Sequence, residues 1–207
     1  MKTTKSSLIV VISFLVVGVF GYMFFSNFKI RNLEIENTLS LADNITVNFT
    51  GTVISNVRLC YLEDNGYVVS IIEKGSSDPC KYKIGERLLV RGSIITSAIK
   101  RVLVESIEVI GTYNASKPLT IQPKEIPDNP SRLIVIKDQI LLNTSILPLS
   151  ETHGDIVIKA AFEEFFVAIA NSYLDEDLIE GRKYEIYGFV WPGKKPFIYG
   201  IKITPSE

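Results

Sequence analysis

The chain of 207 residues is 46% hydrophobic and 22% charged, and its formal net charge is −1. This length allows one large domain or two small ones, and the apolar content is sufficient for a buried core. A net charge near zero excludes an overall basic field that would attract nucleic acid or an anionic membrane. The composition is rich in Ile, Glu and Lys, with glutamine only at Gln122 and Gln139, which is thermophile-like.

The first 43 residues predict a membrane anchor. After a short cytoplasmic tail at residues 1–6, the stretch 7–25 carries no charge. About 19 residues at about 1.5 Å each are long enough to cross a hydrocarbon core about 30 Å thick. A cleaved secretory signal is the alternative, but the candidate cleavage site is poor and apolar residues continue beyond it. We expect a single-pass protein of the cell membrane, with residues 26–43 as a partly helical stalk and the bulk of the chain outside the cytoplasm.

Two further patterns agree with an extracytoplasmic location. Cys60 and Cys80 are the only cysteines, and their spacing fits neither a metal site nor a CxxC redox pair. We expect a disulfide between them; two buried free thiols are the alternative. Four N-x-S/T sequons lie in predicted loops or strand edges and are possible glycosylation sites: Asn44, Asn48, Asn114 and Asn143.

Residues 44–112 predict about five strands and almost no helix. Apolar residues share one parity in 47–57, which Gly51 interrupts, and the Asn-Gly pair at 65–66 predicts a type I′ hairpin turn before the strand "YVVSIIE". The runs "IGERLLVRGSI" and "VLVESIEVI" predict two more strands. Glycines inside strands are typical of small closed barrels. Over about 70 residues this pattern resembles the OB-fold superfamily, and the resemblance implies a five-stranded barrel.

The segment 113–130 contains four prolines and predicts a semi-rigid extended linker. Beyond it, "GRKYEIYGFV" at 181–190 repeats the pattern of "GERLLVRGSI" at 85–94, with glycine at the first and eighth positions and apolar residues of one parity between and after them. We expect both runs to turn that parity toward a barrel interior. The predicted fold is therefore mainly β, with two tandem OB-like five-stranded barrels at 44–112 and 131–207.

The second barrel is predicted to differ from the first by an inserted helix. The apolar residues Phe162, Phe165, Phe166, Ile169 and Tyr173 have helical spacing, and a helix between the third and fourth strands is common in OB-folds. A further strand, "EFFVAIA", is the alternative.

No pattern indicates an enzyme or a cofactor. His153 is the only histidine, and no cluster of Cys, His, Asp or Glu has metal-ligand spacing. A membrane-anchored OB barrel resembles the periplasmic haem chaperones of cytochrome c maturation, which use a His, sometimes a Cys, followed after three residues by Tyr. Here His153 is followed four positions on by Val157, and Cys60 by Asp64, so we expect no haem.

Two surfaces are candidates for ligand binding. The first gathers basic and tyrosine side chains of the first barrel in the region where OB-folds bind single strands: Arg58, Tyr61, Lys81, Tyr82, Lys83, Arg87 and Arg91. The second is the hairpin "YGFVWPGKKPFIYG", with rings and cations at its tip: Trp191, Lys194, Lys195 and Tyr199. An ordinary mixed strand surface is the alternative for the first, and rings that close the barrel are the alternative for the second.

Neither barrel has the charge of a strong nucleic-acid binder. Residues 44–112 hold eight Lys/Arg and seven Asp/Glu, a net of +1, and residues 131–207 hold eight and eleven, a net of −3. We therefore expect a membrane-anchored extracytoplasmic, non-enzymatic binding or scaffold protein with a protein partner at the cell surface. A membrane-tethered single-stranded nucleic-acid-binding protein is the alternative.

Overall fold

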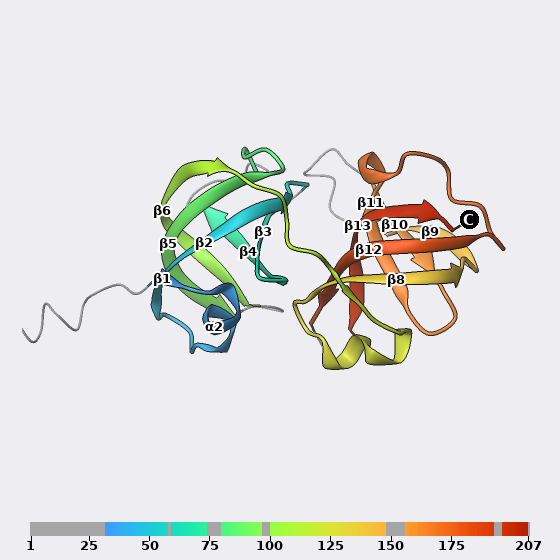
Figure 1. The fold of residues 1–207 in the computed structure, drawn as a ribbon, viewed down its shortest axis with the longest axis horizontal. Coiled ribbons are helices and arrows are strands. Elements are labelled where there is room, and N and C mark those ends of the chain that lie inside the picture. Colours follow the sequence, from blue (N-terminus) through green and yellow to red (C-terminus); the bar gives the residue numbers. More distant parts are fainter. Residues whose placement is uncertain are drawn as a thin grey trace, which may run out of the picture. The chain divides into compact units, whose positions relative to one another are not determined.

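The computed structural model describes residues 32–57, 59–73, 80–96, 100–147, 156–192 and 196–206. The predicted anchor at 7–25, the tail before it and His153 lie outside the described residues. Among the helices of the described ranges, none combines the length and the apolar character needed to span a bilayer. The described residues between 32 and 206 are mainly β-strands and form two sheets, which Figure 1 draws from blue to yellow-green and from yellow to red.

The first sheet closes into a five-stranded barrel. Its strands are β2 (Thr46–Ser55), β3 (Cys60–Asp64), β4 (Tyr67–Glu73), β5 (Glu86–Thr96) and β6 (Lys100–Thr112). They are paired in the order β2-β3-β4-β6-β5, and β5 pairs again with β2. All of these pairs are antiparallel except β4–β6, which is parallel. This closed order confirms the OB-like barrel expected in the first half of the chain.

The hairpin between β3 and β4 has the predicted turn. Asn65 and Gly66 have φ of 53° and 80°, so both central residues are left-handed, as a type I′ turn requires. The glycine at position 51 is explained by close packing. A Cβ there would lie 2.9 Å from the Leu62 Cβ and 3.1 Å from the Ile35 Cδ1, so glycine allows neighbouring segments to pack closely against β2.

The predicted stalk is in part a piece of the first barrel. Strand β1 (Asn32–Leu33) pairs in parallel with β2, and the helix α2 (Ile35–Ser40) follows it. Ile35 is fully buried among the side chains that fill the barrel. A stalk over residues 32–40 is therefore wrong, because burying Ile35 stabilises the packed arrangement by about 1.5–3 kcal/mol.

The second sheet has seven strands: β7 (Leu119–Thr120), β8 (Leu133–Ile140), β9 (Asn143–Leu147), β10 (Val157–Ala161), β11 (Phe166–Ala170), β12 (Lys183–Trp191) and β13 (Phe197–Pro205). Their order is β7-β8-β12-β13-β11-β10-β9. From β8 to β10 this order has the same sequence of neighbours as β2-β5-β6-β4-β3 in the first sheet, including one parallel pair, β11–β13. Strand β9, which follows β8 in the chain, pairs with the far side of β10.

The helix predicted over residues 162–173 is wrong, and the alternative strand is correct. Residues 166–170 form β11, which pairs with β10 on one side and β13 on the other. Val167 and Ile169 point into the core while Phe166 and Ala168 have the opposite parity. Helical and strand periodicities both fit so short a stretch, and pairing with two neighbouring strands decides between them. Only a 3-10 turn, η3 (Asn171–Tyr173), follows.

The proline-rich linker is also more ordered than an extended spacer. Its residues 119–120 form β7, which pairs with β8, and residues 123–128 form the 3-10 helix η1 (Pro123–Asp128). Ile121 and Ile126 are buried in the core of the second sheet. Two buried isoleucines each gain about 1.5–3 kcal/mol from leaving water, which holds this segment against the sheet.

The repeated glycine motif has the same local geometry in both sheets. Gly85 and Gly181 begin the two runs with φ of 90° and 80°. A Cβ on Gly92 would lie 2.3 Å from the Leu103 carbonyl oxygen, and a Cβ on Gly188 would lie 2.3 Å from that of Tyr199. Both glycines adjoin register shifts in their ladders. As predicted, the apolar residues of both runs point inward: Leu88, Val90, Ile94, Tyr184, Ile186 and Val190.

Candidate ligand-binding face

The outer face of β3 and β4, where OB-folds bind their ligands, is covered. Ile54, Tyr61 and Val68 of the first sheet and Leu133, Phe189 and Tyr199 of the second form one buried group, which we call the interface cluster. The Tyr61 ring centroid lies 4.9 Å from those of both Phe189 and Tyr199. The second sheet therefore occupies the surface that the first barrel would offer to a single strand.

Hydrogen bonds at the edges of the interface cluster fix this arrangement. Tyr173 of η3 contacts the end of β2, with its Oη 3.0 Å from the Ser55 Oγ and accepting from the Asn56 N–H at 3.1 Å. On another edge the Val68 N–H donates to the Ser131 carbonyl, and the Leu133 N–H to the Gly66 carbonyl, both at 2.8 Å. Backbone bonds of this kind pair the two sheets directly.

Glu63 joins the same region from the first sheet. Its side chain is 1% exposed, and its two carboxylate oxygens accept from the Gly66 N–H at 2.6 Å and the Ser116 N–H at 3.0 Å. Tyr187 of β12 lies near this carboxylate: burial, and then the negative charge of Glu63, raise the pKa of its phenol. Charge-assisted bonds to a buried carboxylate compensate for its desolvation.

The structure does not bring the predicted basic platform of the first barrel together as one surface. Tyr61 is 3% exposed inside the interface cluster, so its prediction as a stacking residue is wrong. Arg87 is held by Asp64 at 2.6 Å and by the hydroxyls of Thr50 and Thr52. Arg91 pairs with Glu105 on the exposed side of β5. Arg58 lies outside the described residues.

The remaining members of that platform lie together before β5. Lys81 and Lys83 are exposed, and Lys81 donates to Glu73 at 2.8 Å, which raises its pKa. Its Nζ is also 5.3 Å from the centroid of the Tyr82 ring, and burial raises the pKa of Tyr82. Lys81 therefore contacts its neighbour Tyr82 and the Glu73 carboxylate, as on an ordinary strand surface of mixed charge.

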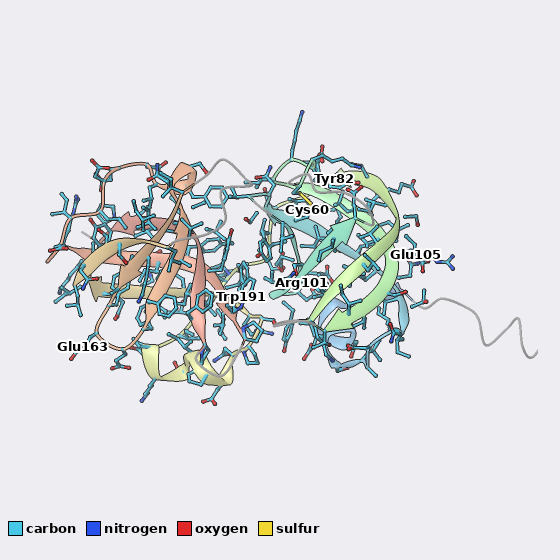
Figure 2. All side chains as sticks on the ribbon, turned by 180° about the vertical axis from the view of Figure 1, so that it is seen from behind. Cys60, Tyr82, Arg101, Glu105, Glu163 and Trp191 are labelled. Carbon is cyan, nitrogen blue, oxygen red and sulfur yellow. A yellow bond between two sulfur atoms is a disulfide. The ribbon has the colours of Figure 1, made fainter. Side chains whose placement is uncertain are left out.

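An open aromatic surface lies instead on the second sheet. Trp191, Phe197 and Phe166, from β12, β13 and β11, form what we call the aromatic strip; Figure 2 labels Trp191. Trp191 and Phe197 stack at 5.7 Å and 20°, and Phe197 and Phe166 at 4.8 Å and 13°. All three rings are half-buried, and their parity places them outside the core. Stacked rings of this kind are rigid apolar contact surfaces.

The aromatic strip runs from the interface cluster to a cation. Trp191 stacks on Tyr199 at 6.2 Å at one end, and the Lys159 Nζ lies 4.9 Å from the Phe166 ring centroid at the other. Lys159 is on β10, so the strip crosses the strands that correspond to β3 and β4 of the first barrel. The sequence reading missed Phe166 and Lys159, since it placed the former in a helix.

The second predicted surface is thus divided by the fold. Trp191 belongs to the aromatic strip, whereas Tyr199 is 7% exposed and belongs to the interface cluster. Lys194 and Lys195 lie outside the described residues. The hairpin was predicted either as a binding surface or as rings that close the barrel, and each prediction fits only part of it. Tyr199 packs against the first barrel, whereas Trp191 is half-buried in the aromatic strip.

The predicted disulfide is confirmed. Cys60 and Cys80 are bonded, with their Cα atoms 4.9 Å apart, and Figure 2 draws the bond in yellow beside the Cys60 label. Of the four sequons, Asn44, Asn114 and Asn143 are exposed, and Asn48 is half-buried within β2. Their glycosylation stays a prediction.

The described residues contain no group of three or more His, Cys, Asp or Glu side chains that could hold a metal ion. What the strip offers chemically is stacking and one cation close to it, which suits binding of a planar or apolar group.

No protein-family model matches the sequence, and the comparison with curated proteins gives no match. Among solved structures, the chain is similar to fission yeast Pot1 with ssDNA at 11% identity and a TM-score of 0.36, covering 86% of this chain and 88% of that one. It is similar to the single-stranded DNA binding protein from Thermus aquaticus at 11% identity and a TM-score of 0.30, covering 80% and 95%. At these values neither protein's activity is transferred to this chain.

Proposed function

We propose that this chain is a non-enzymatic binding protein built from two OB-like barrels in tandem, and that the aromatic strip of the second barrel binds single-stranded nucleic acid. The tandem arrangement is supported by the shared strand order and by the two glycine frames with matching geometry. In this arrangement the first barrel is a scaffold, because the face it would use for binding is covered by the interface cluster.

The observation that carries the proposal is the position of the strip. OB barrels bind oligonucleotides on their second and third strands and adjoining loops. In the second sheet these strands are β10 and β11, which provide Lys159 and Phe166. Trp191 and Phe197 flank the turn that corresponds to the loop between the fourth and fifth strands. Base–aromatic stacking contributes about 1–3 kcal/mol per base and tolerates any sequence.

The charge of the protein limits this binding to a modest affinity. Lys159 lies beside the strip, and Lys194 and Lys195 follow Trp191 closely in the chain. Two or three phosphate contacts of this kind give a slope of log K against log salt of about −2 for a single strand. Stacking is therefore expected to contribute more than phosphate contacts.

Trp191 makes the test direct, since it is the only tryptophan in the chain. Titrating the full chain with an oligothymidine of about 15 nucleotides should quench its fluorescence, because a stacked base contacts the ring. Phe197→Ala and Phe166→Ala should each weaken binding about tenfold, the loss of one stacking contact. Lys159→Gln should reduce the magnitude of the salt slope by about 0.7, the contribution of one phosphate contact on a single strand.

Tyr113→Ala is the matched control, since this ring is 56% exposed and follows directly after β6 of the first sheet. Its binding should equal that of the unchanged protein. The absence of quenching at low salt, or equal quenching by a duplex, rejects the nucleic-acid proposal.

The disulfide favours a second candidate function, a membrane-anchored extracytoplasmic scaffold with a protein partner. Disulfides persist mainly in oxidising compartments. In this proposal the strip contacts protein, and residues 7–25 tether the barrels to the membrane. Thiol labelling of the chain in intact cells, before and after reduction, tests the location: label on Cys60 and Cys80 without a reductant argues against it. The scaffold and the nucleic-acid-binding functions are compatible only if the single-stranded nucleic acid is bound outside the cytoplasm.

A further inference from the structure

A pocket of about 350 Å³ lies where three segments meet, and we call it the junction pocket. The turn of the β3–β4 hairpin contributes Asn65, the linker contributes Ser116 and Lys117, and the start of the second sheet contributes Arg132. None of these residues belongs to the aromatic strip. The volume is within the usual range for small-molecule sites, about 300–1,000 Å³.

The other lining residues give the junction pocket an apolar side. They are Gly66, Pro118, Leu119 and Leu133. Leu133 is completely buried beneath the surface, whereas Leu119 is 40% exposed. The pocket thus combines an apolar wall with an amide, a hydroxyl and two cations, as small-molecule sites commonly do.

The walls of the junction pocket are held by backbone hydrogen bonds. The Leu133 N–H donates to the Gly66 carbonyl, and Tyr67 and Arg132 form a β-bridge between the two sheets. Glu63, below the pocket, accepts from the N–H groups of Gly66 and Ser116, which belong to two of the three converging segments. A ligand therefore meets walls that are already in place, which lowers the entropic cost of binding.

The two cations of the junction pocket are available to a ligand. Across the described residues, no carboxylate lies within 4 Å of the Lys117 Nζ or the Arg132 guanidinium as an ion pair. Arg132 instead lies over the Tyr67 ring, with its Cζ 4.2 Å from the centroid. Both Glu63 oxygens accept backbone N–H groups, and none of the described ion pairs includes Lys117 or Arg132, so the donors of these two side chains are not held by a described carboxylate.

We propose that the junction pocket binds a small organic anion, a phosphate or carboxylate carried on a compact apolar or aromatic body. Lys117 and Arg132 donate to the oxyanion, and Pro118 and Leu119 contact the body. Arg132 is positioned by stacking on Tyr67 and presents its guanidinium edge, which suits two oxygens of one anion. This site is independent of the proposed nucleic-acid function.

The test uses phenyl phosphate as the probe and isothermal titration of the full chain as the measurement. We expect saturable binding, and Lys117→Gln and Arg132→Gln should each weaken it about tenfold, the loss of one charge-assisted contact. Lys183→Gln is the matched control. Lys183 is an exposed lysine at the start of β12, where it pairs with Ile140, whereas Val190 near the end of β12 bonds to Arg132 of the pocket. It should leave binding unchanged.

Further arms separate the parts of the proposal. Inorganic phosphate and phenol should each bind at least about tenfold more weakly than phenyl phosphate, since each lacks one half of the ligand. Trp191→Ala should leave phenyl phosphate binding unchanged even where it abolishes oligonucleotide binding. Equal loss in the Lys183→Gln variant, equal affinity for inorganic phosphate, or no saturation at ~10 mM overturns the proposal. Among the described residues the Lys117 side chain makes no ion pair or hydrogen bond, so the melting temperature of Lys117→Gln should match that of the unchanged protein.

Discussion

At the scale of single residues, two glycines explain why the motif occurs twice. Gly92 and Gly188 each approach a carbonyl oxygen of the partner strand so closely that a Cβ would lie 2.3 Å away. Real Cβ atoms do not tolerate that distance, and the atom in the way belongs to a backbone that cannot move without breaking its ladder. The glycine at the same position in the two runs, 85–94 and 181–190, therefore meets the same steric requirement in both sheets.

Gly92→Ala and Gly188→Ala should each lower the free energy of unfolding by about 3 kcal/mol or more, because the strands must separate to admit the methyl group. Urea unfolding followed by circular dichroism measures this. Gly181→Ala is the control: its φ is 80° and no atom lies within 4 Å of the added Cβ. Only the left-handed backbone then opposes the change, at about 1–2 kcal/mol. Equal losses at the three positions would contradict the steric explanation.

Tyr187 should make the free energy of unfolding decrease at alkaline pH. Burial, and the charge of Glu63, raise the pKa of its phenol above the ordinary 10.0. An unfolded tyrosine loses its proton near pH 10, so above this pH the unfolded state binds fewer protons than the folded state. The contribution of Tyr187 to the free energy of unfolding is complete below the pKa of the unfolded state, and it is lost as the pH rises through the pKa of the folded state.

Tyr187→Phe should therefore reduce the loss of stability as the pH rises through about 10 and above. Urea midpoints measured across this range test the slope, and Tyr113→Phe is the control at an exposed ring. Burial also raises the pKa of Tyr82, so this residue should contribute a slope of the same sign, and the Tyr82→Phe, Tyr187→Phe double variant should flatten the pH dependence further. An unchanged slope in the double variant would rule out this origin.

At the scale of elements, the disulfide joins strand β3 to the segment before β5. It closes a loop with a sequence separation of 20 residues. Loops of this size contribute about 3 kcal/mol by restricting the unfolded chain. Replacing both cysteines by alanine should lower the free energy of unfolding by about that amount.

The comparison of oxidised and reduced protein checks the disulfide effect. A reductant should lower the unfolding midpoint of the unchanged chain and have no effect on the Cys60→Ala, Cys80→Ala variant. Cys60 is 5% exposed, so part of any loss in the variant comes from packing rather than from the bond. A reductant that leaves the midpoint of the unchanged chain in place would show that the bond does not contribute to stability.

For the whole molecule, the interface cluster couples the unfolding of the two sheets. Tyr61 of the first sheet contacts Phe189, Trp191 and Tyr199 of the second, at ring centroid distances of 4.9 to 6.2 Å. The hydrogen bonds of Tyr173 and of the Gly66–Leu133 backbone pair add to these contacts. The two sheets should therefore unfold together in one transition.

Tyr61→Ala should cost about 3–5 kcal/mol and separate the calorimetric transition into two, since it removes the ring shared by three partners. Tyr113→Ala, at an exposed ring, should preserve a single transition with little change in melting temperature. A single, merely lowered transition for Tyr61→Ala would show that backbone pairing alone couples the sheets.

Features that depend on neighbouring residues in the chain could be predicted from the amino-acid sequence. Alternation placed Leu88, Val90 and Ile94 inside the first barrel, and the Asn65–Gly66 pair identified its hairpin turn. The two cysteines were enough to expect their bond. The same local reasoning wrongly favoured a helix over 162–173, because the spacing of the apolar residues in so short a stretch fits both periods.

Which outer surfaces are open could not be predicted before the two sheets were placed against each other. Tyr61 and Trp191 are both outward-facing aromatics at strand positions, yet one is buried and the other lies in the strip. Ile35 and Ile126, read as parts of a stalk and a linker, fill cores. Lys117 and Arg132 meet across a pocket although prolines and a 3-10 helix separate them in the chain. Burial of an outer face depends on the summed contacts of distant segments, and no local pattern of residues contains that sum.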